Sequence, residues 1–133
     1  KKRLSGWDDE LIATMAAPFS RLSHCDQDIE AAHNMILRDL EVVDTTEFSS
    51  VQPLILARFR RDLAAAAQLT RHAVVRLFEG GGGSAIYANG PIERMMRDVS
   101  AGAAHFAFTD DLAAPNYGRA LIGLPPAKSN TFV

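Results

Sequence analysis

The chain has 133 residues, which suits one ordinary domain and leaves too little sequence for two. Apolar residues make up 47% and charged residues 23%, a globular composition, and the formal net charge of −2 does not favour nucleic acid or an anionic membrane as partner. No apolar run approaches the roughly 20 residues that span a bilayer. The first residues are basic, but the apolar stretch of a signal peptide does not follow them. The chain has a single cysteine, Cys25, so it has no internal disulfide, which fits a reducing cytoplasm. One cysteine and four scattered histidines do not form the pattern of a structural zinc site.

The first strong helical pattern covers residues 18–43, after an N-terminal extension (residues 1–16) that can belong to a preceding helix. Apolar residues recur there every three or four positions, which predicts one continuous apolar face. The predicted face comprises Phe19, Leu22, Cys25, Ile29, Ala32, His33, Ile36, Leu37 and Leu40. His33 is therefore expected at the core or at an interface, whereas His24 and His72 are expected at the surface.

A short polar loop at residues 44–50 separates this helix from a second one, predicted over residues 51–79. Its apolar face comprises Leu56, Phe59, Leu63, Ala66, Thr70, Ala73, Val74 and Leu77. The run of alanines at 64–67 would let another helix approach closely. Two helices of about 25 residues with a short loop between them predict an antiparallel αα-hairpin.

Two shorter helices are predicted after a glycine-rich connection, over residues 91–108 and 112–121. Pro91 suits the first turn of a helix, and Thr109 with Asp110 and Asp111 suits an N-terminal cap. Residues 127–133 are expected to be an irregular tail. The fold class is therefore all-α: an up-down bundle of two long and two shorter helices, with the domain spanning residues 17–126.

The run Gly80–Gly83 ends the second helix, because four glycines cost too much backbone entropy for a regular element. It can be a plain turn, or a surface where the main chain approaches a phosphate or a ring. It is neither a P-loop nor a dinucleotide fingerprint, since no Gly-Lys-Ser/Thr follows and no strand precedes.

Arg94, Arg97, Asp98 and His105 are the polar residues of interest in the third predicted helix. Arg97 and Asp98 are adjacent and point to different sides, which favours a solvated face with one interhelical ion pair. His105 follows Arg97 by just over two turns, so the two share one face. Spacing alone leaves His105 open between a partly buried packing histidine and a catalytic one.

Several segments together resemble the C-terminal helical domain of flavin-dependent monooxygenases with the acyl-CoA dehydrogenase fold. They are, in order, RFRRD at 58–62, GGSAIY at 82–87, PIERMMRDV at 91–99, His105, and YGRALIGLP at 117–125. The family includes the oxygenase components of 4-hydroxyphenylacetate hydroxylase, the dibenzothiophene monooxygenases and the actinobacterial phenol-ring hydroxylases. The resemblance covers roughly residues 17–126.

The resemblance implies an oxidoreductase that hydroxylates a small aromatic substrate with O2. A separate reductase supplies the reduced flavin, with FMN favoured over FAD, and the reaction passes through a C4a-hydroperoxyflavin. The residues implied at the cofactor are Gly82, Gly83, Ser84 and Ala85. The resemblance also implies that His105 is catalytic, since an imidazole there can donate a hydrogen bond to the peroxide.

Members of this family also carry an N-terminal helical domain and a middle β-domain, so we expect this chain to be a C-terminal fragment or one part of a split enzyme. The family implies a homotetramer, and a domain that buries few large apolar side chains is expected to self-associate. Two alternatives stay open: an acyl-CoA dehydrogenase-type flavoprotein domain, and a non-enzymatic helical oligomerisation module.

Overall fold

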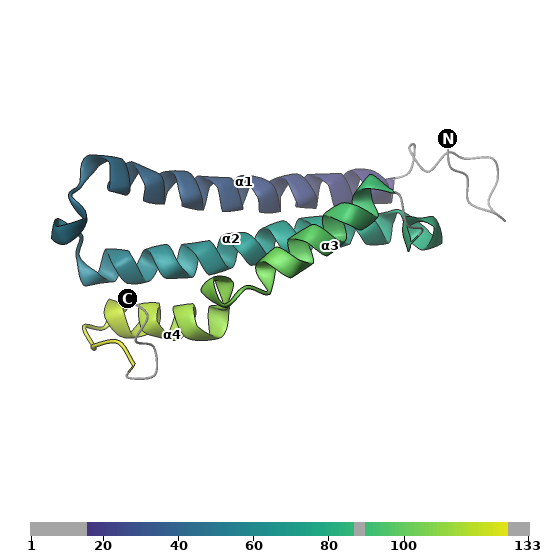
Figure 1. Cartoon of the computed structure of the whole chain (residues 1–133). Coiled ribbons are helices and arrows are strands. Elements are labelled where there is room, and N and C mark those ends of the chain that lie inside the picture. Colours follow the sequence, from purple (N-terminus) through teal and green to yellow (C-terminus); the bar gives the residue numbers. More distant parts are fainter. Residues whose placement is uncertain (1–15, 87–89, 128–133) are drawn as a thin grey trace.

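The computed structural model describes residues 16–86 and 90–127, and it contains helices and no strand over those ranges (Figure 1). The helices in chain order are α1 (Ala16–Thr45), η2 (Phe48–Ser50), α2 (Pro53–Gly80), η3 (Gly82–Ile86), α3 (Pro91–Ala103), η4 (Phe106–Phe108) and α4 (Asp110–Leu121), where η marks a 3-10 helix. The predicted fold class, two long antiparallel helices and two shorter ones, is confirmed. The expected extension lies outside the described residues, except Ala16, which begins α1.

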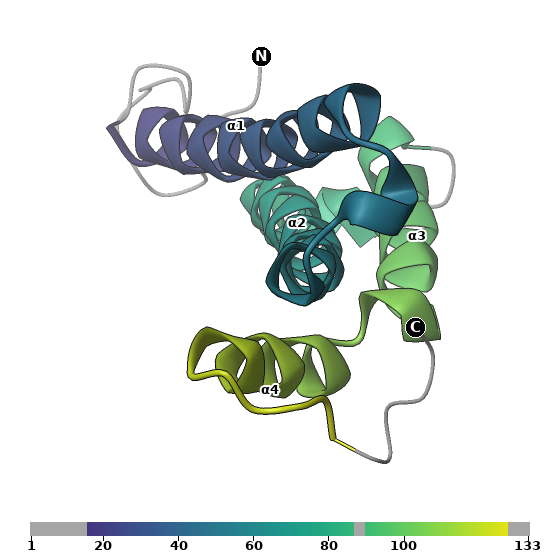
Figure 2. The ribbon, with the colours of Figure 1, turned by 90° about the vertical axis from the view of Figure 1, so that its left-hand side faces the viewer.

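The second helix, α2, is the centre of the bundle. It contacts α1, α3 and α4, and a view nearly along its axis shows the other three helices arranged around it (Figure 2). Pro53 occupies its first turn, where the missing N–H costs no hydrogen bond. None of the described helices is long and apolar enough to cross a membrane.

The contact between α1 and α2 is made by small side chains. Cys25 and Ala32 of α1 are buried, as are the α2 alanines Ala64, Ala66 and Ala73. The Cys25 Sγ lies 3.3 Å from the carbonyl oxygen of Ala73 and donates to it. The alanine run thus allows the close approach of helices that the sequence predicted.

The apolar face predicted for α1 is only partly buried. The residues of α1 that are buried, Cys25, Ala32 and Asp39, are seven apart, which is two helical turns. The large members of the predicted face are about half exposed: Phe19, Leu22, Ile29, Leu37 and Leu40, with His33 exposed as well. We call these residues, together with Val43, the outer face of α1. His24 and His72 are exposed, as expected.

The fourth helix begins where the sequence placed its cap, but the cap works differently. Thr109 precedes α4 and its side chain makes no capping hydrogen bond. Two carboxylates in the first turn, Asp110 and Asp111, instead complement the positive end of the helix dipole. After α4, residues 124–127 have no regular structure, and the Arg119 Nε donates to the Pro125 carbonyl oxygen at 2.7 Å.

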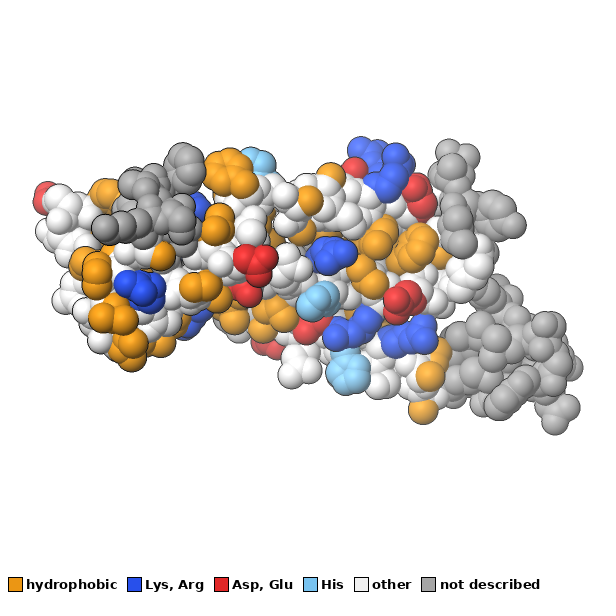
Figure 3. Space-filling view, turned by 90° about the horizontal axis from the view of Figure 1, so that it is seen from below, with side chains coloured by type: hydrophobic (Ala, Val, Ile, Leu, Met, Phe, Trp, Pro, Cys, Tyr) orange, Lys and Arg blue, Asp and Glu red, His pale blue; other side chains and the backbone are white. Residues whose placement is uncertain are grey.

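Apolar and charged side chains are interspersed on the face of the molecule seen from below (Figure 3). Basic and acidic side chains alternate there without a broad field of one sign. Exposed apolar residues in and directly after η4 and α4 include Phe106, Leu112, Leu121 and Ile122. Many apolar side chains of the described residues therefore remain exposed.

Candidate functional site

The glycine run stops α2, as the sequence predicted. Gly80 is the last residue of the helix, and the Gly81 N–H donates to the carbonyl oxygens of Leu77 and Phe78 at 3.1 and 3.0 Å. Gly82 has a φ of 63°, a left-handed conformation that glycine adopts without strain. The run is not wholly irregular, because Gly82 and Gly83 enter the short η3 helix.

The space around each glycine differs along the run. A Cβ added to Gly81 would lie 2.7 Å from the Ala85 Cβ, so no larger residue fits there without movement. A Cβ on Gly80 would lie 3.1 Å from the Arg21 Nη1, whereas one on Gly83 would meet nothing within 4 Å. The turn is thus closely packed at Gly81 and has open space at Gly83, where a ligand could reach the main chain.

His105 does not belong to α3, so the prediction of a helix over residues 91–108 is wrong. The helix ends at Ala103, and the His105 N–H donates to the Gly102 carbonyl oxygen at 3.0 Å. The His105 Nδ1 then accepts a hydrogen bond from the Ala107 N–H at 3.2 Å, which caps η4. In neutral imidazole this bond leaves the proton on Nε2.

The His105 side chain is exposed and packs against aromatic neighbours rather than in the bundle core. Its ring centroid lies 4.6 Å from that of Phe106 and 6.0 Å from that of Phe108. Its orientation is therefore set by the η4 turn and these two rings. The expectation that it shares a helical face with Arg97 is wrong for the same reason, since the chain leaves the helix before His105.

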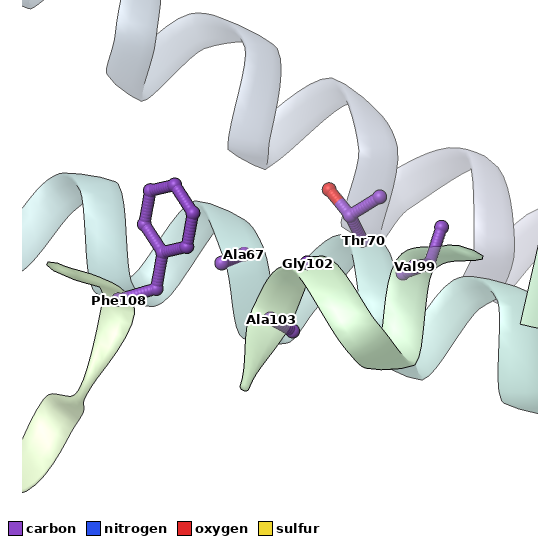
Figure 4. A pocket seen from close by; sticks show the side chains of 6 residues that line it. All are labelled: Ala67, Thr70, Val99, Gly102, Ala103 and Phe108. Atoms are coloured by element: carbon purple, nitrogen blue, oxygen red, sulfur yellow. The ribbon is translucent and has the colours of Figure 1, made fainter. Parts of the chain in front are cut away.

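A small depression of about 220 Å3, largely open to solvent, lies between α2, α3 and η4, beside the Phe108 ring (Figure 4). It is lined by Ala67, Thr70, Val99, Gly102, Ala103 and Phe108. The Thr70 hydroxyl donates to the Ala66 carbonyl oxygen at 2.8 Å, so the lining offers little polar character. An apolar depression of about this size can hold one aromatic ring.

The structure does not bring His105 and the glycine turn together. They flank opposite ends of α3, whose 13 residues correspond to a length of about 20 Å at 1.5 Å per residue. One flat ring therefore cannot contact both. The candidate residues therefore form two separate groups, the glycine turn before α3 and His105 after it.

Two ion pairs on α3 replace the interhelical pair expected from the sequence. Arg94 Nε lies 3.4 Å from an Asp98 oxygen, and Arg97 Nε lies 2.7 Å from a Glu93 oxygen. Both pairs join residues four apart on one helix. The two arginines and Asp98 are largely exposed, so these pairs stabilise the helix only slightly.

The buried polar cluster of the fold lies between α1 and α2. The Asp62 carboxylate is fully buried and accepts hydrogen bonds from Arg38 and Arg61. The Asp39 Oδ1 lies 3.1 Å from the Arg58 Nη2, while its other oxygen, Oδ2, is buried without a hydrogen-bond partner. Burial, with repulsion from Asp62 second, raises the pKa of Asp39 against the opposing attraction of Arg58 and Arg38.

This cluster also reaches α4. The Arg61 guanidinium carbon lies 4.0 Å from the centre of the Tyr117 ring, a cation–π contact between α2 and α4. The sequence singled out the segment 58–62 only through its resemblance to a family. The signal that was missed is the spacing of Asp39 seven residues after Ala32, which places its carboxylate on the side of α1 that faces α2. No group of three or more metal-ligating side chains occurs within residues 16–86 and 90–127.

The all-helical bundle, with its glycine-terminated central helix, has the architecture of the C-terminal domain of an acyl-CoA dehydrogenase. The family model described as "Acyl-CoA dehydrogenase, C-terminal domain" matches residues 9–110, and the chain belongs to this family.

Within it, the chain is similar to the oxygenase subunit HsaA, a flavin-dependent monooxygenase of Mycobacterium tuberculosis. The identity is 31% over 113 residues, covering 82% of this chain and 29% of HsaA.

Two solved structures show the same helical arrangement. The HsaA monooxygenase from M. tuberculosis superposes with a TM-score of 0.77 and 27% identity, over 90% of this chain and 32% of that one. The 3-HSA hydroxylase from Rhodococcus sp. RHA1 gives a TM-score of 0.80 and 25% identity, over 96% of this chain and 33% of that one. The chain thus spans about a third of the length of these relatives.

Proposed function

We propose that this chain is the C-terminal helical domain of a flavin-dependent monooxygenase that hydroxylates a small aromatic substrate. The observation that carries the proposal is the similarity to HsaA, a flavin-dependent monooxygenase, over 82% of the chain. A flavin monooxygenase of this kind receives reduced flavin from a separate reductase. Cys25 is buried and unpaired, which is compatible with a cytoplasmic location.

The glycine turn is the part of the chain that we assign to the flavin, through Gly82, Gly83, Ser84 and Ala85. A group that approaches the main chain needs a surface without side chains, and Gly83 faces open space while Gly82 adopts its left-handed turn. This backbone surface fits a flavin, with FMN favoured over FAD. When bound, the reduced flavin supplies the reaction with O2.

His105 is the residue that we assign to proton delivery at the reacting centre. Its Nδ1 is held by the Ala107 N–H, so Nε2 carries the proton and is the atom that can donate. The Phe106 and Phe108 rings lie against the imidazole and limit its orientation. The apolar depression beside Phe108 has the size of one aromatic ring, as a small aromatic substrate requires.

We further propose that the domain assembles into a homotetramer through exposed helix faces. The outer face of α1 leaves Phe19, Leu22, Ile29 and Leu40 about half exposed, at 50–57%. Burying apolar surface stabilises by about 25 cal/mol per Å2, so a row of such residues favours association. A shared assembly also allows the two ends of α3 to contribute to different flavin sites.

The test is a hydroxylation assay on the protein expressed from its complete reading frame, supplied with a flavin reductase, NADH, O2 and simple phenols. Hydroxylated product that depends on both reductase and O2 supports the proposal. Oxidation of an acyl-CoA thioester instead would establish the acyl-CoA dehydrogenase alternative. Absence of reduced-flavin binding in the complete protein would contradict the proposal and favour a helical oligomerisation module.

A further inference from the structure

An arginine on α1 lies directly beside the glycine turn. Although Arg21 is 59 positions away from Gly80 in the sequence, a Cβ on Gly80 would lie 3.1 Å from the Arg21 Nη1 and 3.5 Å from its Cδ. The first turns of α1 and the last turn of α2 occupy the same end of the bundle (Figure 1). The absence of a side chain at Gly80 is what gives the guanidinium its place.

The charge of Arg21 is not neutralised within the described part of the chain. Its side chain is exposed, and no carboxylate or hydrogen-bond acceptor among residues 16–86 and 90–127 pairs with it. The neighbouring arginine of α2, Arg76, differs because Asp28 forms an ion pair with it. Among residues 16–86 and 90–127, Arg21 is thus a cation beside this turn that has no ion-pair partner.

The glycine turn and Arg21 together suit one end of a flavin nucleotide better than its ring. A guanidinium recognises phosphate through charge-assisted hydrogen bonds, and an open glycine main chain lets a phosphate approach closely.

We infer that Arg21 binds the phosphate of the flavin at the glycine turn. The inference rests on the proposed function and extends it, because the phosphate contact then comes from α1 and the main-chain contact from the turn after α2. The competing explanation is structural: a cation beside the C-terminal end of α2 complements the helix dipole. The two explanations differ in whether the phosphate group matters.

The experiment compares reduced riboflavin, which has no phosphate, with reduced FMN and reduced FAD. Anaerobic ultrafiltration of the complete protein gives the dissociation constant of each flavin for the wild type and for Arg21→Gln. We expect FMN and FAD binding to weaken about tenfold or more, the scale of one charge-assisted hydrogen bond, and riboflavin binding to be unchanged. Added salt should shrink the preference of the wild type for FMN over riboflavin.

Two further variants serve as controls. Arg71→Gln removes an exposed α2 arginine away from the turn and should leave all three dissociation constants unchanged. Gly80→Ala keeps the charge but places a methyl group against the Arg21 guanidinium, so we expect a smaller loss of FMN affinity with unchanged riboflavin affinity. Melting temperatures show whether each variant is folded.

Three outcomes overturn the inference. Equal weakening of riboflavin and FMN by Arg21→Gln would place the arginine away from the phosphate. A lower melting temperature with an unchanged FMN-to-riboflavin ratio would establish the helix-dipole role alone. A wild-type protein that binds none of the three flavins would remove the proposed function itself, and the inference with it.

Discussion

The Arg38 guanidinium on α1 donates a hydrogen bond to the carboxylate of Asp62 on α2, and that carboxylate is fully buried. Arg61 donates to the same carboxylate, and the Arg58 Nε lies 3.9 Å from it. A buried charge of this kind is tolerated because its partners surround it. The pair therefore connects the two long helices at a point where their other contacts are between small apolar side chains.

Removing the Asp62 carboxylate should strongly destabilise the bundle. We expect Asp62→Ala to cost about 3–5 kcal/mol, because three arginines would then lie beside one remaining carboxylate, Asp39, in a largely buried setting. Urea denaturation followed by circular dichroism measures the loss, with the exposed Glu30→Ala as the matched control expected within about 0.5 kcal/mol of wild type. A loss below about 1 kcal/mol at Asp62 would contradict a stabilising cluster.

Asp39 should make stability depend on pH in the direction opposite to an ordinary ion-paired carboxylate. Its folded-state pKa is raised above the unfolded value of about 3.8, so the folded protein binds the extra proton between those two pKa values. The contribution of Asp39 to the free energy of unfolding is therefore most favourable at acidic pH, and it is lost as the pH rises through this window. The stability of wild type relative to Asp39→Asn should fall from pH 4 towards neutrality, and a rise would refute the assignment.

The glycine turn provides a matched pair of substitutions that separate packing from ligand contact. Gly81→Ala should lower stability by about 1–3 kcal/mol, since its Cβ would overlap the Ala85 Cβ. Gly83→Ala should leave the melting temperature unchanged, because its Cβ would meet nothing within 4 Å, yet should weaken flavin binding if the main chain there is a flavin contact. Flavin binding by Gly83→Ala that equals that of wild type would remove Gly83 from the cofactor surface.

Replacing His105 should uncouple O2 consumption from hydroxylation. We expect His105→Ala to lower hydroxylation by about 2–4 kcal/mol in activation free energy, the scale of one preorganised donor, while flavin binding largely survives. Hydrogen peroxide should then replace hydroxylated product, which a peroxide assay beside product quantification detects. His72→Ala, an exposed histidine on α2, is the control. An unchanged product-to-peroxide ratio with a lower melting temperature would show that His105 only packs.

A charge on the outer face of α1 should disrupt assembly. We expect Ile29→Glu to shift the protein from a homotetramer to smaller species in size-exclusion chromatography with light scattering, because Ile29 is 50% exposed and lies on that face. Gln27→Glu adds the same charge on another side of α1 and should leave the tetramer intact. Equal masses for Ile29→Glu and wild type would exclude this face from the interface.

The sequence was sufficient for the two long helices and for the glycine turn that ends α2. Repeats of three and four residues predicted α1 and α2, and the glycine run gave the end of α2 through local backbone chemistry, whereas α2 begins at Pro53 rather than at the predicted residue 51. It was not sufficient to show how much of the predicted α1 face is buried. Of that face, the small residues Cys25 and Ala32 are buried against α2, because their size permits close approach, whereas the large residues stay about half exposed.

The position of His105 could not be read from periodicity either. The helical pattern continues beyond Ala103, but the chain turns after Gly102 and a side-chain cap from His105 starts η4 instead. Such a cap depends on one hydrogen bond and leaves no repeating pattern. The proximity of Arg21 to Gly80 could not be predicted from the sequence either, because only the antiparallel packing of α1 and α2 brings those two positions together.

The central position of α2 has a consequence for how the domain opens. Since α3 and α4 pack mainly on α2, either short helix can detach in a sub-global fluctuation while the α1–α2 pair keeps its amide hydrogens protected from exchange. The connection that carries His105 joins those two short helices, so we expect its amide hydrogens to exchange sooner than those of the α1–α2 pair. The glycine turn, anchored to the end of α2 itself, stays with the more persistent unit.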